Sequence, residues 1–141
     1  MKKIVSTKDA PAAVGPYSQA IRSGSMLFCA GQIPLDPQTG QIVSDDISAQ
    51  TRRVLENISA VLRAAHLNFG HVVKTTIFLT SMGDFQTVNE IYATYFKDNP
   101  PARSTVGVSS LPKGAKVEIE VIAMTQDRDS GDDRTVSDTS G

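Results

Sequence analysis

The sequence has 141 residues, with 14 basic and 15 acidic side chains and a formal net charge of −1. That balance provides no general attraction to nucleic acid or to an anionic membrane, and the length fits a single domain. The only cysteine, Cys29, cannot form an internal disulfide, and no apolar run is long enough to be a signal peptide or a membrane span. We therefore expect a cytoplasmic protein without a membrane partner.

The first part of the chain is predicted to hold three short strands separated by turns that contain glycine and proline. The expected strands cover residues 3–6, 17–22 and 26–30. Gly15 and Pro16 form a turn, so Tyr17 is expected to begin the second strand with its ring placed by that turn. The ring is either a half-buried aromatic or the wall of a ligand site, and the sequence leaves both open.

A helix is predicted over residues 46–65, where apolar side chains recur at helical spacing. Ser44, Asp45 and Asp46 all offer N-cap chemistry. Asn68 and Gly70 are expected to end the helix.

Residues 72–80 are the clearest strand, since almost all are β-branched or aromatic, and apolar residues on both faces indicate a central position. Ser81 and Asp84 suggest a capping box for a second helix, which ends before the prolines at 100 and 101. Asn89 in this helix is expected to be a polar surface residue.

Two further extended segments place charged residues among apolar ones. In VEIEV, Val117 and Ile119 share one face of the strand, so Glu118 points to the other. In RSTVGV, Arg103 and Thr105 share the face opposite to the valines. A guanidinium can grip a carboxylate and a glutamate can hold a water, which together suit a small organic acid. A structural Arg–Glu ion pair is the simpler explanation of these residues taken alone.

These elements predict an α+β fold in which one layer of two helices covers one face of a mixed sheet. No helix remains for the other face, so we expect self-association through it. Residues 1–125 form the expected domain. Residues 126–141 are polar and acidic, with Val136 as the one apolar side chain, and are predicted to be a disordered tail.

Several chemistries lack their motifs. Gly114-Ala115-Lys116 misses the other residues of a phosphate-binding loop, and no dinucleotide fingerprint follows a strand. His66 and His71 with Cys29 fall short of a zinc set, and Cys29 fits a core position better than a nucleophile. We expect no metal, no cofactor and no nucleic-acid partner.

Six segments follow one another in an informative order and spacing. They are GPYSQAI, CAGQIPLDPQTG, VVKTTIFL, DFQTVNEIY, PARSTV and KVEIEVIA. Taken together they resemble the RidA/YjgF family of enamine and imine deaminases over about residues 3–124. The resemblance implies a chorismate-mutase-like fold with a six-stranded sheet, and a homotrimer whose sheets pack inward as a barrel with ligand clefts between subunits.

By matching motifs, Arg103 would grip the carboxylate of the substrate and Glu118 would position the hydrolytic water. Tyr17 would close the pocket from the adjacent chain, the Gly31 backbone would line its floor, and Thr105 would reach the other end of the ligand. The implied reaction converts 2-aminoacrylate and 2-aminocrotonate to 2-keto acids and ammonia without a cofactor.

Two departures from the family pattern alter the polarity of the expected pocket. Many members carry serine where this chain has Ala30, and cysteine where it has Thr105. Alternative functions for the same cleft are a ligand sensor without turnover and a ribonuclease or translation inhibitor, and a chaperone-like role would depend on exposed apolar surface instead.

Overall fold

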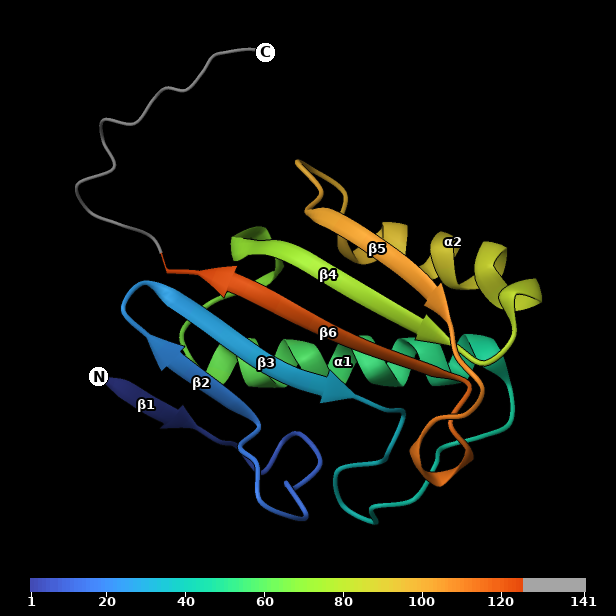
Figure 1. Cartoon of the computed structure of the whole chain (residues 1–141), viewed down its shortest axis with the longest axis horizontal. Coiled ribbons are helices and arrows are strands. Elements are labelled where there is room, and N and C mark those ends of the chain that lie inside the picture. The colour runs from blue at the N-terminus through green and yellow to red at the C-terminus, as the bar shows by residue number, and fades with distance from the viewer. Residues whose placement is uncertain (126–141) are drawn as a thin grey trace.

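The computed structural model describes residues 1–125, and the predicted tail lies outside the described residues. Six strands form one sheet in the order β1-β2-β3-β6-β4-β5. Every neighbouring pair is antiparallel except β4 and β5, which are parallel. Helices α1 and α2 both lie on the same face of this sheet (Figure 1). The predicted α+β architecture with one helical layer is confirmed.

The strands occupy nearly the predicted segments. Their bounds are β1 Lys2–Val5, β2 Ala20–Ser23, β3 Met26–Gln32, β4 Val72–Leu79, β5 Ala102–Gly107 and β6 Val117–Met124. The prediction that Tyr17 begins a strand is wrong, since pairing starts only at Ala20, opposite Val5 and Cys29. Tyr17 instead follows a tight turn, in which its N–H donates to the Gly15 carbonyl at 2.9 Å.

Helix α1, Ile47–Ala64, begins where the sequence predicts, because the Asp46 side chain accepts a hydrogen bond from the Ala49 N–H at 2.9 Å. Its end agrees with the predicted range, but the residues that stop it differ from the prediction. His66 takes the left-handed conformation with φ of 64° just after the helix, and Asn68 caps a separate 3-10 turn, Phe69–His71. The chain therefore leaves α1 before it reaches Asn68 or Gly70.

Helix α2 spans Phe85–Tyr95 and connects the parallel strands β4 and β5. The predicted capping box is wrong: the Ser81 side chain makes no cap hydrogen bond, and residues Met82–Asp84 form a 3-10 turn that leads into the helix. A 3-10 turn satisfies the first backbone groups through i to i+3 bonds, so no side-chain cap is needed.

The core lies between the helices and one face of the sheet. Alternate residues of the inner strands, such as Leu27, Ile77 and Ile119, are 0–1% exposed and belong to one core cluster with the apolar residues of α1. The position of β4 between β6 and β5 confirms the predicted central strand. Within residues 1–125, no helix is long and apolar enough to cross a membrane.

The other face of the sheet carries no helix and keeps large apolar side chains in contact with solvent. Phe28, Val106 and Met124 are 41–45% exposed there. The register places Glu118 in one row with Phe78 and Val106 on this open face. An exposed apolar area of this kind marks an interaction surface more often than a solvated one.

Three buried carboxamides attach the surface loops to this scaffold. Gln19, 3% exposed, donates to the carbonyl oxygens of Thr7, Ala10 and Pro11 at 2.8–3.3 Å and accepts from the Thr7 N–H at 2.7 Å. One side chain therefore satisfies the backbone of the loop between β1 and β2, which has no strand partner of its own.

Two carboxamides of α1 act in the same way on other loops. Asn57 is fully buried and donates to the carbonyl oxygens of Ile33 and Leu35 at 3.3 and 3.0 Å. Gln50, 1% exposed, accepts from the Lys116 N–H at 2.9 Å. The loop after β3 and the entry to β6 are thus both held against the first helix.

We predict that Gln19→Met, which keeps the shape but removes the amide, lowers the free energy of unfolding by about 3 kcal/mol because buried backbone groups lose their partners. Urea unfolding measures the change, and limited proteolysis should then cut the loop between β1 and β2. Gln38→Met changes the same residue type at an exposed site and serves as the control. Equal stability of both variants would contradict this role.

Candidate functional site

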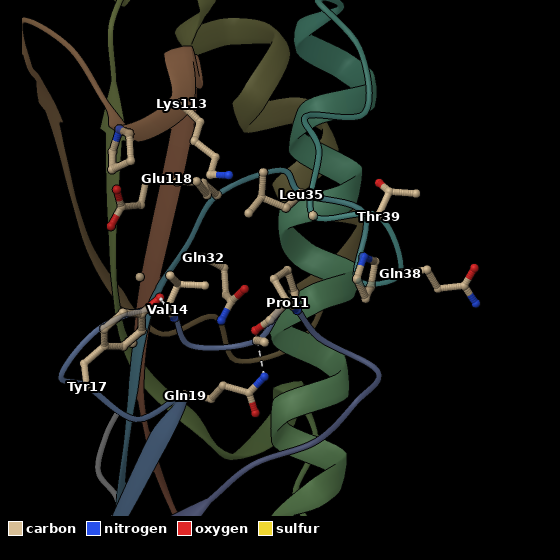
Figure 2. Close-up of a pocket in the computed structure, with 17 residues that line it drawn as sticks. Pro11, Val14, Tyr17, Gln19, Gln32, Leu35, Gln38, Thr39, Lys113 and Glu118 are labelled. Atoms are coloured by element: carbon tan, nitrogen blue, oxygen red, sulfur yellow. Dashed lines mark hydrogen bonds between the residues drawn. The ribbon is translucent and has the colours of Figure 1, made fainter.

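A pocket of about 730 Å³ opens at one end of the sheet, where the loops after β1, β3 and β5 meet. It contains Tyr17, Gly31 and Glu118, three of the residues that the sequence singled out. Figure 2 shows Tyr17 and Glu118 on the same side of the pocket, facing Leu35 and Pro11 across it. The volume lies within the range of small-molecule sites.

A β-bulge shapes the floor of this pocket. Strand β3 pairs Cys29 with Val121 and Gln32 with Ile119, so Ala30 and Gly31 together oppose the single residue Glu120. An extra residue of this kind bends a strand and re-aims its side chains. The bulge turns the Gly31 backbone toward the pocket.

The Glu118 side chain lies against the α-carbon of Gly31, so its present position depends on glycine at the bulge. A Cβ built at position 31 would lie 2.9 Å from the carboxyl carbon of Glu118 and closer still to one of its oxygens. Any larger residue would push the carboxylate aside. The pair therefore acts as one unit, in which a bare backbone positions an acid.

The Glu118 carboxyl is half-buried and lacks a compensating charge. Desolvation by burial, followed by the nearby charge of Glu120, raises its pKa above the ordinary value of 4.5. Within residues 1–125 no cation or hydrogen-bond donor opposes these two effects. A carboxyl group with a raised pKa exchanges protons more readily near neutral pH, which is the property of a general acid or base.

Arg103 lies elsewhere, on β5 beneath α2. Its Nη1 donates to Oδ1 of Asn89 at 2.7 Å, and its guanidinium carbon lies 5.0 Å from the ring centre of Tyr92 and 5.6 Å from that of Phe85. The side chain remains exposed. It is a cation held by neutral groups, with donors left for an anion.

The register explains why the two charged residues do not meet. Arg103 lies beside Thr75, which is fully buried under the helices, whereas Glu118 lies beside Phe78 on the open face. Thr75 and Phe78 are three positions apart on β4, an odd number, so they point to opposite faces. The alternative of a structural Arg103–Glu118 ion pair is therefore wrong for a single chain.

Thr105 shares the helix-facing side of β5 with Arg103, as the alternation predicts. Its Oγ1 is buried and has no hydrogen-bond partner among the described residues. A buried hydroxyl without a partner is destabilising, and this oxygen is not open to a ligand in the isolated chain.

The predicted site residues thus fall into two groups. Tyr17, Gly31 and Glu118 line one pocket within a single chain, so Tyr17 does not need a second chain to reach Glu118. Arg103 and Thr105 form the other group. Within one chain Tyr17 lies in the same pocket as Glu118, whereas Arg103 is separated from both, and pocket closure by an adjacent chain stays a prediction.

The sequence interpretation missed two residues near these groups. Asn89 was expected on the surface, but it is half-buried and bonds Arg103. Lys113 lines the pocket in a left-handed conformation with φ of 58°. For Asn89, the only indication in the sequence was a carboxamide on the inner side of the predicted second helix. For Lys113, the sequence contained no indication of a place in the pocket.

The cysteine and potential metal ligands do not belong to either set of predicted site residues. Cys29 is 7% exposed, and burial raises the pKa of its thiol to about 12, so the prediction of a core cysteine is confirmed. In the part of the chain that the structure describes, no cluster of three or more His, Cys, Asp or Glu side chains could hold a metal ion.

Comparisons with known proteins agree on one family. The profile described as "Endoribonuclease L-PSP" matches residues 7–125. The 2-iminobutanoate/2-iminopropanoate deaminase of Salmonella typhimurium is 50% identical over 127 residues, which cover 88% of this chain and 98% of that protein.

Solved structures give the same result. YyfA of Yersinia pestis, described as belonging to the conserved Rid protein family, is 56% identical with a TM-score of 0.87, covering 89% of this chain and 100% of that one. The Escherichia coli protein TdcF, solved with bound serine, is 46% identical with a TM-score of 0.84, covering 88% and 99%.

Because the Thr105 hydroxyl has no partner, we predict that Thr105→Val raises the free energy of unfolding by about 1 kcal/mol. Valine has nearly the same shape and leaves no buried polar atom unsatisfied. Urea unfolding of the two proteins measures the difference. A loss of stability would show instead that the hydroxyl is bonded in solution, for example by a second chain.

Proposed function

This chain belongs to the RidA/YjgF family, also described as endoribonuclease L-PSP, and on that premise we propose that it hydrolyses small 2-imino acids at a site assembled from two copies of the chain. The substrates are 2-aminoacrylate, 2-aminocrotonate and their imine forms, and the products are 2-keto acids and ammonia. The observation that carries the proposal is the separation of Arg103 from Glu118 on the two faces of one sheet.

Each group of residues supplies one half of what such a reaction needs. The Arg103 guanidinium is exposed and suited to a carboxylate, but it has no acid–base group beside it. The pocket with Glu118 offers a proton-exchanging carboxyl and room for a ligand. Lys113 is the only basic residue that lines this pocket in the described part of the chain, and it is exposed. A second chain that brings Arg103 to this pocket completes the set.

The proposed mechanism uses few groups. Arg103 holds the substrate carboxylate, which places the imine carbon next to a water on Glu118. Water adds to the carbon while Glu118 accepts its proton and returns a proton to the nitrogen. The C–N bond then breaks and ammonia leaves, so one imine and one water become one 2-keto acid and one ammonia. Desolvated Glu118 suits this relay because its pKa is already raised.

We propose that the copies form the homotrimer implied by the sequence resemblance, with the open faces of the sheets turned inward. The exposed Phe28, Val106 and Met124 support this arrangement, since their burial would remove apolar surface from water. In this assembly Arg103 of one chain, with Thr105 on the same face of β5, approaches Tyr17, Gly31 and Glu118 of its neighbour.

The family description also raises ribonuclease activity as a second candidate. Acid–base cleavage of RNA commonly relies on histidine, the side chain whose ordinary pKa lies near neutrality. Neither His66 nor His71 lines the pocket that the structure describes, and the net charge is −1. The deaminase therefore remains the function that the site supports better.

The proposal is tested by generating 2-aminoacrylate with a lyase that depends on pyridoxal phosphate, with semicarbazide competing for the imine. We expect the wild type to divert imine to pyruvate, whereas Arg103→Ala and Glu118→Gln each lose at least about a hundredfold in rate, because each removes a group that acts on the transition state. Product binding without turnover in the wild type would favour the ligand sensor. RNA cleavage that depends on Glu118 would favour the ribonuclease.

If the site is shared between chains, two inactive variants should restore activity when they assemble together. Arg103→Ala and Glu118→Gln chains, unfolded together and refolded as a mixture, should regain activity that neither has alone. Random assortment leaves about a quarter of the interfaces with both native groups. A mixture as inactive as its components would contradict the shared site, while separately refolded variants combined afterwards provide the control.

The raised pKa of Glu118 predicts the pH dependence. The carboxyl must be ionised to accept the proton of water, so kcat/KM should rise with pH through the pKa of Glu118 in the assembly, which burial and Glu120 raise and an approaching Arg103 lowers. Glu120→Gln removes the smaller of the two causes of the shift, and the acid limb should move to lower pH. Glu90→Gln removes an equal charge at an exposed position on α2 and should leave the profile unchanged.

A further inference from the structure

The Arg103 side chain is fixed before any ligand arrives. Its Nη1 donates to Asn89 Oδ1 at 2.7 Å across the gap between β5 and α2. Arginine side chains at the surface otherwise sample many rotamers, and ordering one on binding costs conformational entropy. The bond to a half-buried carboxamide on a helix removes much of that freedom in advance.

Two aromatic rings support the same guanidinium. The Tyr92 ring centre lies 5.0 Å from Arg103 Cζ, and the Phe85 ring centre lies 5.6 Å from it, both within the range of cation–π attraction. Both rings belong to α2, as Asn89 does. One helix therefore presents all three of these groups to the cation.

The Tyr92 ring is itself held in place. It is 5% exposed, and its hydroxyl shares a 2.8 Å hydrogen bond with Thr75 Oγ1, which is fully buried. Its ring also packs against Phe96 with a centroid distance of 4.4 Å. Thr75 is the register neighbour of Arg103 on β4. The Tyr92 ring that contacts Arg103 is thus hydrogen-bonded to β4, the strand next to β5, and β5 carries Arg103.

Resting on the proposed function, we propose that Asn89 and Tyr92 are positioning residues that hold the Arg103 guanidinium with its remaining donors free for the carboxylate of the 2-imino acid. A guanidinium has five N–H donors in one plane, and Asn89 engages one of them. A two-point contact with a carboxylate requires that plane to be oriented correctly. The rings and the carboxamide together define it.

Asparagine at position 89 leaves the positive charge of Arg103 available, so the site selects an anionic ligand. A neutral carbonyl oxygen accepts from Arg103 without cancelling its charge, so the cation keeps its attraction for an anion. A carboxylate at this position would form an ion pair with Arg103 and compete with the substrate. The family reaction needs the cation free, and a carboxamide satisfies both requirements.

The test compares Asn89→Ala, Asn89→Asp and Tyr92→Leu with the wild type. We measure the Kd of 2-oxobutanoate by calorimetry and the kcat and KM for 2-aminoacrylate generated in situ. Asn89→Ala should weaken ligand binding and raise KM about tenfold, the usual worth of a hydrogen bond to a charged group, with kcat nearly unchanged. Gln86→Ala removes an exposed carboxamide from the same helix and is the matched control.

Asn89→Asp gives a readout that a merely structural role would not move. Its binding of 2-oxobutanoate should be weaker than that of Asn89→Ala at pH 7, and it should recover at low pH as the introduced carboxyl becomes protonated. The wild type should show no such recovery. Tyr92→Leu should weaken binding, whereas Tyr92→Phe, which keeps the ring, should bind the ligand nearly as the wild type does.

The outcomes separate this inference from the proposed function. Wild-type turnover that is lost in Arg103→Ala but unchanged in Asn89→Ala and Asn89→Asp would overturn the positioning role alone. No turnover in the wild type, or no effect of Arg103→Ala, would overturn both. Unfolding midpoints in urea, equal for Asn89→Ala and Gln86→Ala, ensure that a change in KM reports on Arg103 and not on stability.

Discussion

The structure depends on one constraint: a sheet whose residues alternate between two faces has helices on only one of them. This alternation sends Leu27, Ile77 and Ile119 into the core and leaves Phe28 and Val106 in solvent. The same alternation places Arg103 under α2 and Glu118 on the open side. The exposed apolar face of the sheet and the separation of Arg103 from Glu118 therefore have the same cause. A second copy of the chain can cover that face and bring an Arg103 to Glu118.

The loops that build the pocket have almost no strand pairing, so their backbone groups need other partners. Gln19 and Asn57 provide them from buried positions, and Gln50 holds the backbone where the chain enters β6. These three buried carboxamides are tolerated because each has hydrogen-bond partners. The result is a pocket wall that is irregular in secondary structure yet fixed in place, which is a requirement for orienting a small ligand.

The two halves of the proposed site are prepared in opposite ways. Arg103 is exposed, but neutral groups on α2 hold it, so it keeps its charge and some of its donors. Glu118 is confined against Gly31 and partly desolvated, which raises its pKa. A hydrated cation that is pre-oriented captures an anion quickly, while a desolvated acid exchanges protons readily. Each property would be weakened if the two residues formed an ion pair within one chain.

The sequence by itself determined the elements and their faces. Apolar periodicity located the helices, and β-branched and aromatic composition located the strand at 72–80. Alternation in VEIEV and RSTVGV assigned Glu118 and Arg103 to faces opposite their apolar neighbours. The stop signal of α1 and the entry to α2 were not predictable, because a left-handed His66 and a 3-10 turn replaced the expected caps. Only the tertiary structure decided that Arg103 and Glu118 point away from each other and that Asn89 contacts the arginine. Periodicity within a strand defines two faces but does not say which face meets the helices. That depends on the register between β4, β5 and β6, which long-range pairing sets.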